Sequence, residues 1–132
     1  MKNHCPFCEI TKHDKKRIIK QNDLAFIIRD GFPVSEGHTL IIPKRHVASF
    51  FEITNEERRA LLDLLDQVQK DLDHKLKPAA YNIGINDGIA AGQTVPHLHV
   101  HLIPRYKGDV EDPRGGIRWI MPDKADYWSN KT

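Results

Sequence analysis

The sequence lacks the features that mark a membrane, secreted or nucleic-acid-binding protein. No apolar run approaches the roughly 20 residues that a membrane-spanning helix needs. The first ten residues, MKNHCPFCEI, contain no apolar segment of the kind found in a secretory signal. Twenty basic and eighteen acidic residues leave a net charge of only +2, whereas a nucleic-acid-binding face is normally strongly basic. We therefore expect neither a membrane partner nor a nucleic-acid partner.

Internal repeats, low-complexity segments and linkers are also absent from the 132 residues. A chain of this length is expected to form a single domain, residues 1–132, because it can bury roughly two-thirds of its unfolded surface. Cysteine occurs only twice, but histidine occurs eight times, which is a high number for this length. The positions of these cysteines and histidines therefore carry the functional argument.

The expected elements predict an α+β fold with an antiparallel sheet. Strands are expected at both ends of residues 18–30, around a turn at 21–23, and at 38–43, 81–86 and 97–104. Thr54 and Glu57 form a capping-box pattern at the start of one long helix, which Pro78 stops. The helix should carry an apolar stripe made of Leu61, Leu65, Val68, Leu72 and Leu76. About five strands in mostly hairpin order favour an antiparallel sheet over a parallel one.

His97, His99 and His101 alternate with aliphatic residues in the last expected strand. Successive side chains of a strand point to opposite faces, so the three imidazoles should share one face, with neighbouring Cα atoms roughly 7 Å apart. A solvated face, a Zn²⁺ site and a nucleophilic site are three interpretations of this pattern. In the third, an imidazole attacks phosphorus and forms a covalent nucleotidyl-histidine. The solvated face is the least favoured, because strict alternation of three histidines does not suit a merely solvated surface.

Cys5 and Cys8 have the spacing Cys-x-x-Cys, which suits either one shared metal ion or a redox disulfide. The sequence has no second such pair, so any further metal ligands would have to be histidines. The pair precedes the first expected strand instead of following a strand at a helix start, which argues against a thioredoxin-like role. No Asp or Glu lies near the three histidines to act as a base, which argues against a catalytic metal there.

The segment GQTVPHLHVHLIPR, residues 92–105, resembles the signature of the histidine triad (HIT) superfamily. NDGIAAGQ and FIIRDGFPVSEGHTLIIPKRH extend this resemblance over about residues 5–105. GQTV and the Pro-Arg that follows the triad look like the fragile-histidine-triad branch, and RGGIRWIMPDKADYW is similar to the tail of bacterial diadenosine-polyphosphate hydrolases. The resemblance implies a HIT-like α+β fold of about five strands, one long helix and one short helix. An arm at about 1–15 and a tail at about 106–132 would flank it.

The resemblance also implies an enzyme that acts at the α-phosphorus of a nucleotide through a nucleotidyl-histidine intermediate. His99 matches the nucleophile, His101 matches a phosphate contact, and His38 matches a histidine that supports the nucleophile from behind. The remaining implied contacts are Gln93 for the phosphate region and water, Asp30 for ribose hydroxyls, and Asn86 and Thr94 for the phosphate side.

The implied substrates are a dinucleoside polyphosphate, a nucleoside phosphoramidate or an adenylyl sulfate, with a transferase as the outcome if an acceptor replaces water. A nucleotide-binding signalling module with slow turnover is the alternative. The resemblance further implies a structural Zn²⁺ held by Cys5, Cys8, His46 and His97, as in many bacterial members. Retained thiolates fit a reducing cytoplasm, which is the expected location. A homodimer, formed by edge-to-edge pairing of two sheets, is the expected assembly.

Overall fold

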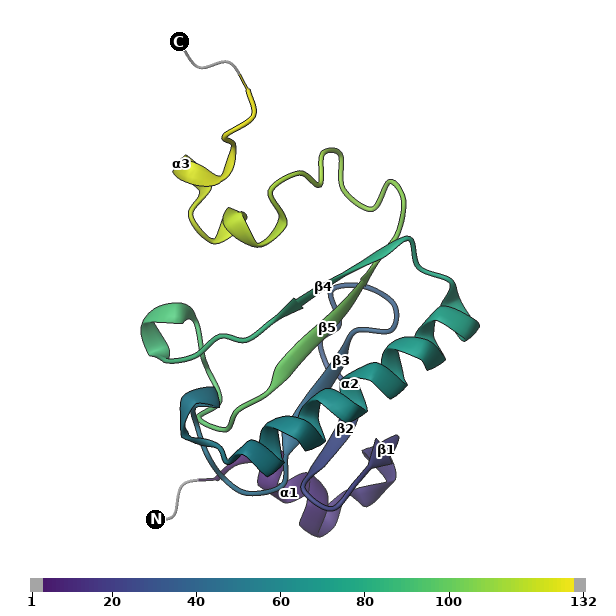
Figure 1. Cartoon of the computed structure of the whole chain (residues 1–132), viewed down its shortest axis with the longest axis vertical. Coiled ribbons are helices and arrows are strands. Elements are labelled where there is room, and N and C mark those ends of the chain that lie inside the picture. Colours follow the sequence, from purple (N-terminus) through teal and green to yellow (C-terminus); the bar gives the residue numbers. More distant parts are fainter. Residues whose placement is uncertain (1–3, 130–132) are drawn as a thin grey trace.

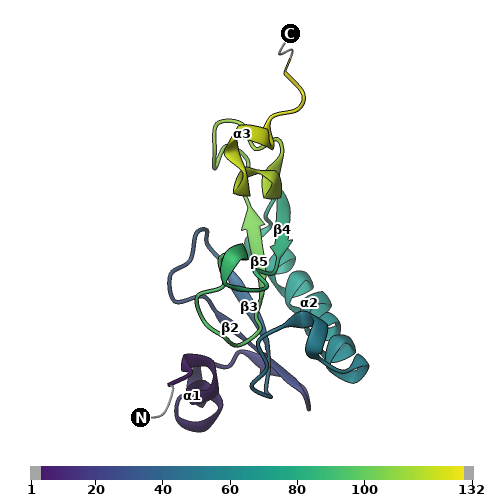
Figure 2. The ribbon, with the colours of Figure 1, turned by 90° about the vertical axis from the view of Figure 1, so that its left-hand side faces the viewer.

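The computed structural model describes residues 4–129, so residues 1–3 of the expected arm and 130–132 of the expected tail lie outside it. Five strands form one antiparallel sheet in the order β1-β2-β3-β5-β4. Helix α2 lies across one face of the sheet and α1 lies against the other (Figures 1 and 2). The expected α+β fold is thereby confirmed. The bounds are α1 Pro6–His13, β1 Lys20–Gln21, β2 Ala25–Arg29, β3 Thr39–Pro43, α2 Asn55–Leu76, β4 Ala80–Gly84, β5 Val100–Arg105 and α3 Pro122–Ala125.

Helix α2 begins and ends as its local sequence predicts. The Glu57 N–H donates to the Thr54 hydroxyl at 3.0 Å, and the Thr54 N–H donates to the Glu57 carboxylate at 2.9 Å, which completes the capping box. The last helical residue is followed by Lys77, whose φ of 50° is left-handed, and then by Pro78. Both ends therefore follow from contacts within a few residues.

The buried stripe of α2 differs from the predicted one by one position. Leu64 is buried, whereas Leu65, which the prediction placed in the stripe, is only partly buried. The buried leucine and valine side chains of α2 are Leu61, Leu64, Val68 and Leu72, and their spacing of three or four residues keeps them on one face of the helix. Leu76, also predicted in the stripe, is partly buried at the last turn.

The two faces of the sheet bury different clusters. Leu98, Val100 and Leu102 pack with Ile27 and Ile41 against α2, as the alternation predicts. On the opposite face, Phe7 and Ile10 of α1 pack with the side chains of β2 and β3, namely Phe26, Ile28, Leu40 and Ile42. The triad histidines belong to this second face, so α1 lies beside them.

Strand β5 begins later than predicted. Residues 97–99 precede the paired strand: the His97 N–H donates to the Val95 carbonyl at 2.7 Å, and the Leu98 N–H donates to the Val47 carbonyl at 2.7 Å instead of to β3. The alternation of faces nevertheless continues through them, since Leu98 stays in the α2 cluster. Past β5, a 3-10 turn (Gly116–Ile120) and α3 lie beyond the end of the β4–β5 pair (Figure 1). None of the helices within residues 4–129 is both long and apolar enough to cross a membrane.

Candidate active site and metal centre

The hydrogen bond of His99 determines which of its nitrogens carries the proton. Its Nδ1 lies 2.8 Å from the main-chain oxygen of His97. A carbonyl oxygen only accepts hydrogen bonds, so Nδ1 must be the donor, and in a neutral imidazole the lone pair then lies on Nε2. The residue is 9% exposed, so it is nearly buried. An oriented imidazole with its lone pair on Nε2 has the form that a nucleophile requires.

His38 and His101 form a second hydrogen-bonded pair with a fixed direction. The Val34 N–H donates to His38 Nδ1 at 3.2 Å, so the proton of His38 lies on Nε2. That Nε2 lies 2.9 Å from His101 Nδ1, which therefore accepts, and leaves the proton of His101 on its own Nε2. Burial, followed by the neighbouring histidines, lowers the pKa of His101 to about 4. His101 is thus neutral at pH 7 and offers an N–H group without a positive charge.

Asp30 completes this group from the end of β2. Its N–H donates to the His38 carbonyl at 2.9 Å, so the β2–β3 hairpin brings the two residues together across eight positions of sequence. The Phe32 N–H donates to Asp30 Oδ1 at 2.8 Å, and Oδ2 lies 3.4 Å from His38 Nε2. Burial lowers the pKa of His38, and the Asp30 carboxylate opposes that shift. The structure therefore brings together Asp30, His38 and His101, with the His99 ring 5.1 Å from that of His101.

Gln93 lies in the β4–β5 connection, and its amide is engaged by main-chain groups. Its Nε2 donates to the carbonyls of Ala48 and Val95 at 2.9 and 3.1 Å, and its Oε1 accepts from the Gly88 N–H at 2.8 Å. Both amide hydrogens are thereby used. A phosphate contact by this amide would have to replace one of these bonds. The side chains of Asn86 and Thr94, which belong to the same connection, are exposed.

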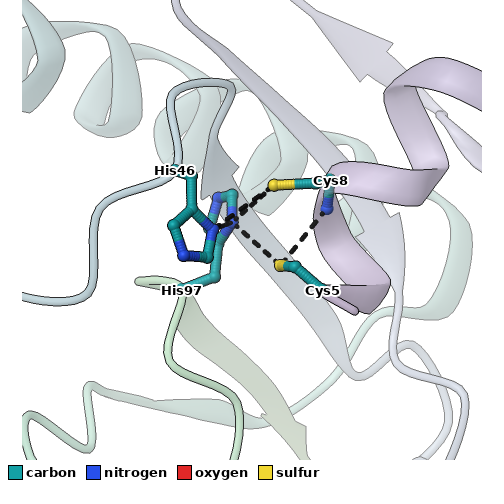
Figure 3. Close-up of side chains that lie close together, drawn as sticks. All are labelled: Cys5, Cys8, His46 and His97. Atoms are coloured by element: carbon teal, nitrogen blue, oxygen red, sulfur yellow. Dashed lines mark hydrogen bonds between the residues drawn. The ribbon is translucent and has the colours of Figure 1, made fainter. Parts of the chain in front are cut away.

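The expected metal ligands converge from three parts of the chain (Figure 3). Cys5 and Cys8 come from the start of α1, His46 from the segment after β3, and His97 from the segment before β5. His97 Nε2 donates to the Pro43 carbonyl at 2.8 Å, so its Nδ1 directs a lone pair toward the two sulfurs. His46 also points Nδ1 into this group (Figure 3). Two sulfur atoms and two imidazole nitrogens, all possible metal ligands, thus point toward a common centre.

The separations of these donors fit a tetrahedral zinc ion. With the usual Zn–N and Zn–S bond lengths, a tetrahedron places two nitrogens about 3.3 Å apart and a nitrogen and a sulfur about 3.5 Å apart. The two Nδ1 atoms of His46 and His97 lie 3.2 Å apart. The sulfur-to-nitrogen distances are 3.3 Å for Cys5 to His97, 3.3 Å for Cys8 to His46 and 3.5 Å for Cys8 to His97. Two thiols and two imidazoles also have the chemistry of a structural zinc site.

Phe7 is a residue of the site that the sequence analysis missed. Its ring centroid lies 5.0 Å from that of His99 and 5.7 Å from that of His97, both in edge arrangements. Strict alternation suggests an imidazole on each side of His99. Within residues 4–129, however, the ring contacts of His99 are with Phe7 and His101. The available signal was the helical spacing of Phe7, inside the cysteine motif, and Ile10, two residues after it.

Comparison with known proteins places this site in a family context. The model of the HIT domain matches residues 11–108. An uncharacterised HIT-like protein of Mycoplasma pneumoniae is 38% identical over 106 residues, which cover 80% of this chain and 74% of that protein. A bis(5'-nucleosyl)-tetraphosphatase of Schizosaccharomyces pombe is 44% identical over 80 residues, covering 61% of this chain but only 44% of that protein. The adenosine 5'-monophosphoramidase hnt1 of the same yeast is 36% identical over 102 residues, covering 76% and 74%.

Solved structures show the same likeness. A HIT family protein from Bacillus anthracis aligns with a TM-score of 0.76 at 31% identity, covering 83% of this chain and 78% of that one. A zinc-bound histidine triad family protein from Mycobacterium smegmatis aligns with a TM-score of 0.72 at 34% identity, covering 80% and 77%. The fold and its arrangement of elements are therefore shared well beyond the triad itself.

Proposed function

Because the chain belongs to the HIT domain family, we propose that it is a nucleotide hydrolase in which His99 attacks the α-phosphorus of its substrate. The observation that carries this proposal is the hydrogen bond from His99 Nδ1 to the His97 carbonyl. It holds the imidazole in the tautomer whose Nε2 can form a bond to phosphorus. Hydrolases among the relatives with known names support the same reaction class.

The proposed reaction has two displacements. Nε2 of His99 forms a bond to the α-phosphorus while the bond from phosphorus to the leaving group breaks, and the leaving group takes up a proton from solvent. Water then attacks the phosphorus of nucleotidyl-His99 and gives up a proton to solvent, while the bond from phosphorus to Nε2 breaks; this releases the mononucleotide and restores the lone pair on Nε2. Both steps place negative charge on the non-bridging oxygens, where oriented N–H donors stabilise the transition state.

The neighbouring residues have roles that follow from their hydrogen bonds. The Nε2–H group of His101 donates to a non-bridging phosphate oxygen, and His38 holds it in that tautomer. Asp30 keeps acceptor capacity for ribose hydroxyls, because each carboxylate oxygen accepts more than one bond. Asn86 and Thr94 supply further phosphate contacts, while Gln93 positions the connection that carries them and contacts phosphate or water by exchanging one loop bond.

The proposed substrate is a dinucleoside polyphosphate, as the name of the tetraphosphatase relative suggests. A nucleoside phosphoramidate is the second candidate, because the phosphoramidase relative matches a larger share of this chain. Both reactions use the same attack at the α-phosphorus and differ in the leaving group. A signalling module differs from either enzyme in rate, since its nucleotide would dissociate faster than it is hydrolysed.

We also propose that Cys5, Cys8, His46 and His97 hold one Zn²⁺. Support comes from the donor geometry and from the zinc-bound structural relative. When bound, the ion would supply a cross-link between α1, the segment after β3 and the segment before β5. Four protein ligands leave a tetrahedral ion no open position for water, so this ion would have a structural role.

A second copy of the chain is the proposed partner. β4 is the last strand in the sheet order, and an apolar groove of about 240 Å³ lies beside it between α2 and β5. Ile83 of β4 and Leu62 of α2 are each more than half exposed at this groove. Pairing of two β4 edges would cover both features. A sedimentation measurement that gave the monomer mass at micromolar concentration would contradict this.

The test of the proposed reaction is a pair of histidine substitutions. His99→Ala should reduce turnover of a dinucleoside tetraphosphate, an adenosine phosphoramidate and an adenylyl sulfate by several orders of magnitude, because an essential nucleophile is lost. His74→Ala is the matched control; His74 is exposed on α2, so its substitution should leave turnover unchanged. Mass spectrometry of the quenched parent protein should show one added nucleotidyl group on His99. Near-parental turnover by His99→Ala on every substrate would refute the assignment.

A further inference from the structure

The edge contact of Phe7 with His99 raises the question of what fixes the plane of the nucleophilic ring. The hydrogen bond from Nδ1 to the His97 carbonyl holds one edge of the imidazole. It leaves the ring free to tilt about that edge, and a tilt moves Nε2, which lies across the ring. The rings that contact His99 therefore decide where its lone pair points. Those rings are Phe7 at 5.0 Å with an interplanar angle of 65° and His101 at 5.1 Å with 63°.

Phe7 is buried in the first turn of a capped helix. It is 8% exposed and packs with Ile10 into the apolar cluster on the α1 face of the sheet. Pro6 precedes it at the first turn of α1, where its restricted φ suits the helix start. Cys5 caps this helix by accepting the Cys8 N–H at 3.4 Å, so the residues that flank Phe7 also belong to the metal-binding group. The ring therefore has little freedom to follow a moving imidazole.

We propose that Phe7 is a positioning residue for the nucleophile, whose ring sets the plane of the His99 imidazole so that Nε2 faces the α-phosphorus. This inference rests on the proposed function of His99. In this proposal the Cys-Pro-Phe-Cys segment has two roles. The cysteines bind the metal, and the phenylalanine between them, which is fixed by the position of α1, orients His99 Nε2. The edge contact of Phe7 with the His97 ring at 5.7 Å joins the same ring to a metal-binding residue.

The expected effect is on the rate of the chemical step. A misplacement of the reacting atom by about 1 Å can lower a rate by about 100-fold, so loss of the ring should lower kcat by about 10- to 100-fold. KM should stay within about twofold of the parent value, because Phe7 orients the nucleophile and is not proposed to bind the nucleotide. Loss of a residue that served only for packing would not lower kcat while leaving KM unchanged.

The experiment compares Phe7→Leu with Ile10→Ala in the full-length, zinc-loaded protein. Ile10 lies in the same helix and the same cluster, is 2% exposed, and has no aromatic ring to pack against the histidines. Elemental analysis and thermal unfolding establish that each variant is folded and metal-loaded. The readouts are kcat, KM and the imidazole nitrogen NMR signals of ¹⁵N-histidine-labelled protein, with His99 assigned by its absence from His99→Ala.

Phe7→Leu should lower kcat and shift the His99 Nε2 signal, because a tilted ring places this nitrogen in a different environment while the Nδ1 hydrogen bond keeps the tautomer. Ile10→Ala should leave both kcat and this signal unchanged at temperatures well below its melting point. Equal losses of kcat in the two variants, or unmoved His99 signals in Phe7→Leu, would overturn the inference. If Phe7→Leu does not fold, Phe7→Met is judged by the same criteria. If the parent hydrolyses no nucleotide, the proposed function fails, and the NMR comparison alone decides whether Phe7 positions His99.

Discussion

Replacing Glu57 by Gln removes a charge that joins the start of α2 to the segment carrying His46. The Arg45 guanidinium donates to both carboxylate oxygens, through Nε at 2.9 Å and Nη2 at 2.8 Å. The Thr54 N–H donates to the same carboxylate at 2.9 Å. The Glu57 side chain is 5% exposed, whereas that of Arg45 is 51% exposed. Glutamine keeps the shape and can keep the cap, but it cannot keep the ion pair.

The size of the effect follows from the pKa of Glu57. The hydrogen bonds from Arg45, aided by that from the Thr54 backbone, lower this pKa from 4.5 to about 2. A displacement of that size corresponds to about 3 kcal/mol of folding free energy at neutral pH. Because the Arg45 partner is half exposed to solvent, we reduce the expected loss in Glu57→Gln to about 1–2 kcal/mol.

The pH dependence has a definite sign. The folded-state pKa lies below the unfolded one, so the stabilisation is fully present above about pH 4.5 and is lost as the pH falls toward 2. Urea unfolding of the parent and of Glu57→Gln should therefore give different free energies at pH 7 and converging values near pH 2. Comparison at equal pH cancels any loss of bound metal that the proteins share.

Glu56→Gln is the matched control, because Glu56 is exposed and shares the first turn of α2 without a contact to Arg45. Its substitution should cost only a few tenths of a kcal/mol, through the helix dipole. If Glu57→Gln and Glu56→Gln lost the same free energy, or if the Glu57→Gln loss persisted unchanged at pH 2.5, the ion-pair argument would be refuted.

Two further predictions concern the metal and the β4–β5 connection. Protein purified without added metal should contain one Zn²⁺ per chain and Cys5→Ser should not, by elemental analysis; active, well-folded, zinc-free parent protein would sink this proposal. A chelator should lower the melting temperature more than the initial rate at low temperature, since four protein ligands leave no open position; immediate loss of rate with the fold intact would favour a catalytic metal. Gln93→Ala should lower stability by about 1–2 kcal/mol and slow breakdown of nucleotidyl-His99 more than its formation, in a rapid-quench assay. If the breakdown rate were unchanged, the role of Gln93 would be limited to its hydrogen bonds within the loop.

The long helix was predictable because its signals are local. The capping box at Thr54 and the stop at Pro78 each depend on residues within one turn. The start of β5 was not predictable, because it depends on whether Leu98 bonds to β3 or to Val47, which the chain reaches only after folding. The exchange of Leu65 for Leu64 in the buried stripe has a similar cause, since both fit the helical period and the facing sheet selects between them.

In the site, residue types were predictable but proton positions were not. The pattern and the resemblance identified His99, His101 and His38 as a group. Their tautomers depend on main-chain partners, namely the His97 carbonyl and the Val34 N–H, which no spacing rule reveals. Phe7 was missed for a related reason: within a cysteine motif it resembles a spacer, and its contact with the nucleophile exists only once α1 is packed on the sheet.

The bonds of His97 keep the candidate metal site and the candidate nucleophile separate although they are two residues apart. Its Nδ1 faces the cysteines, its Nε2 donates to Pro43, and its main-chain oxygen accepts from His99. The three atoms of His97 therefore face three different groups, and the lone pair of His99 Nε2 takes part in none of these contacts. A metal on the Nδ1 side would anchor His97 without drawing on the electrons that the proposed attack needs. The alternation of histidines thus supports two chemistries in one short segment, because His97 and His99 direct different nitrogens away from their main-chain partners.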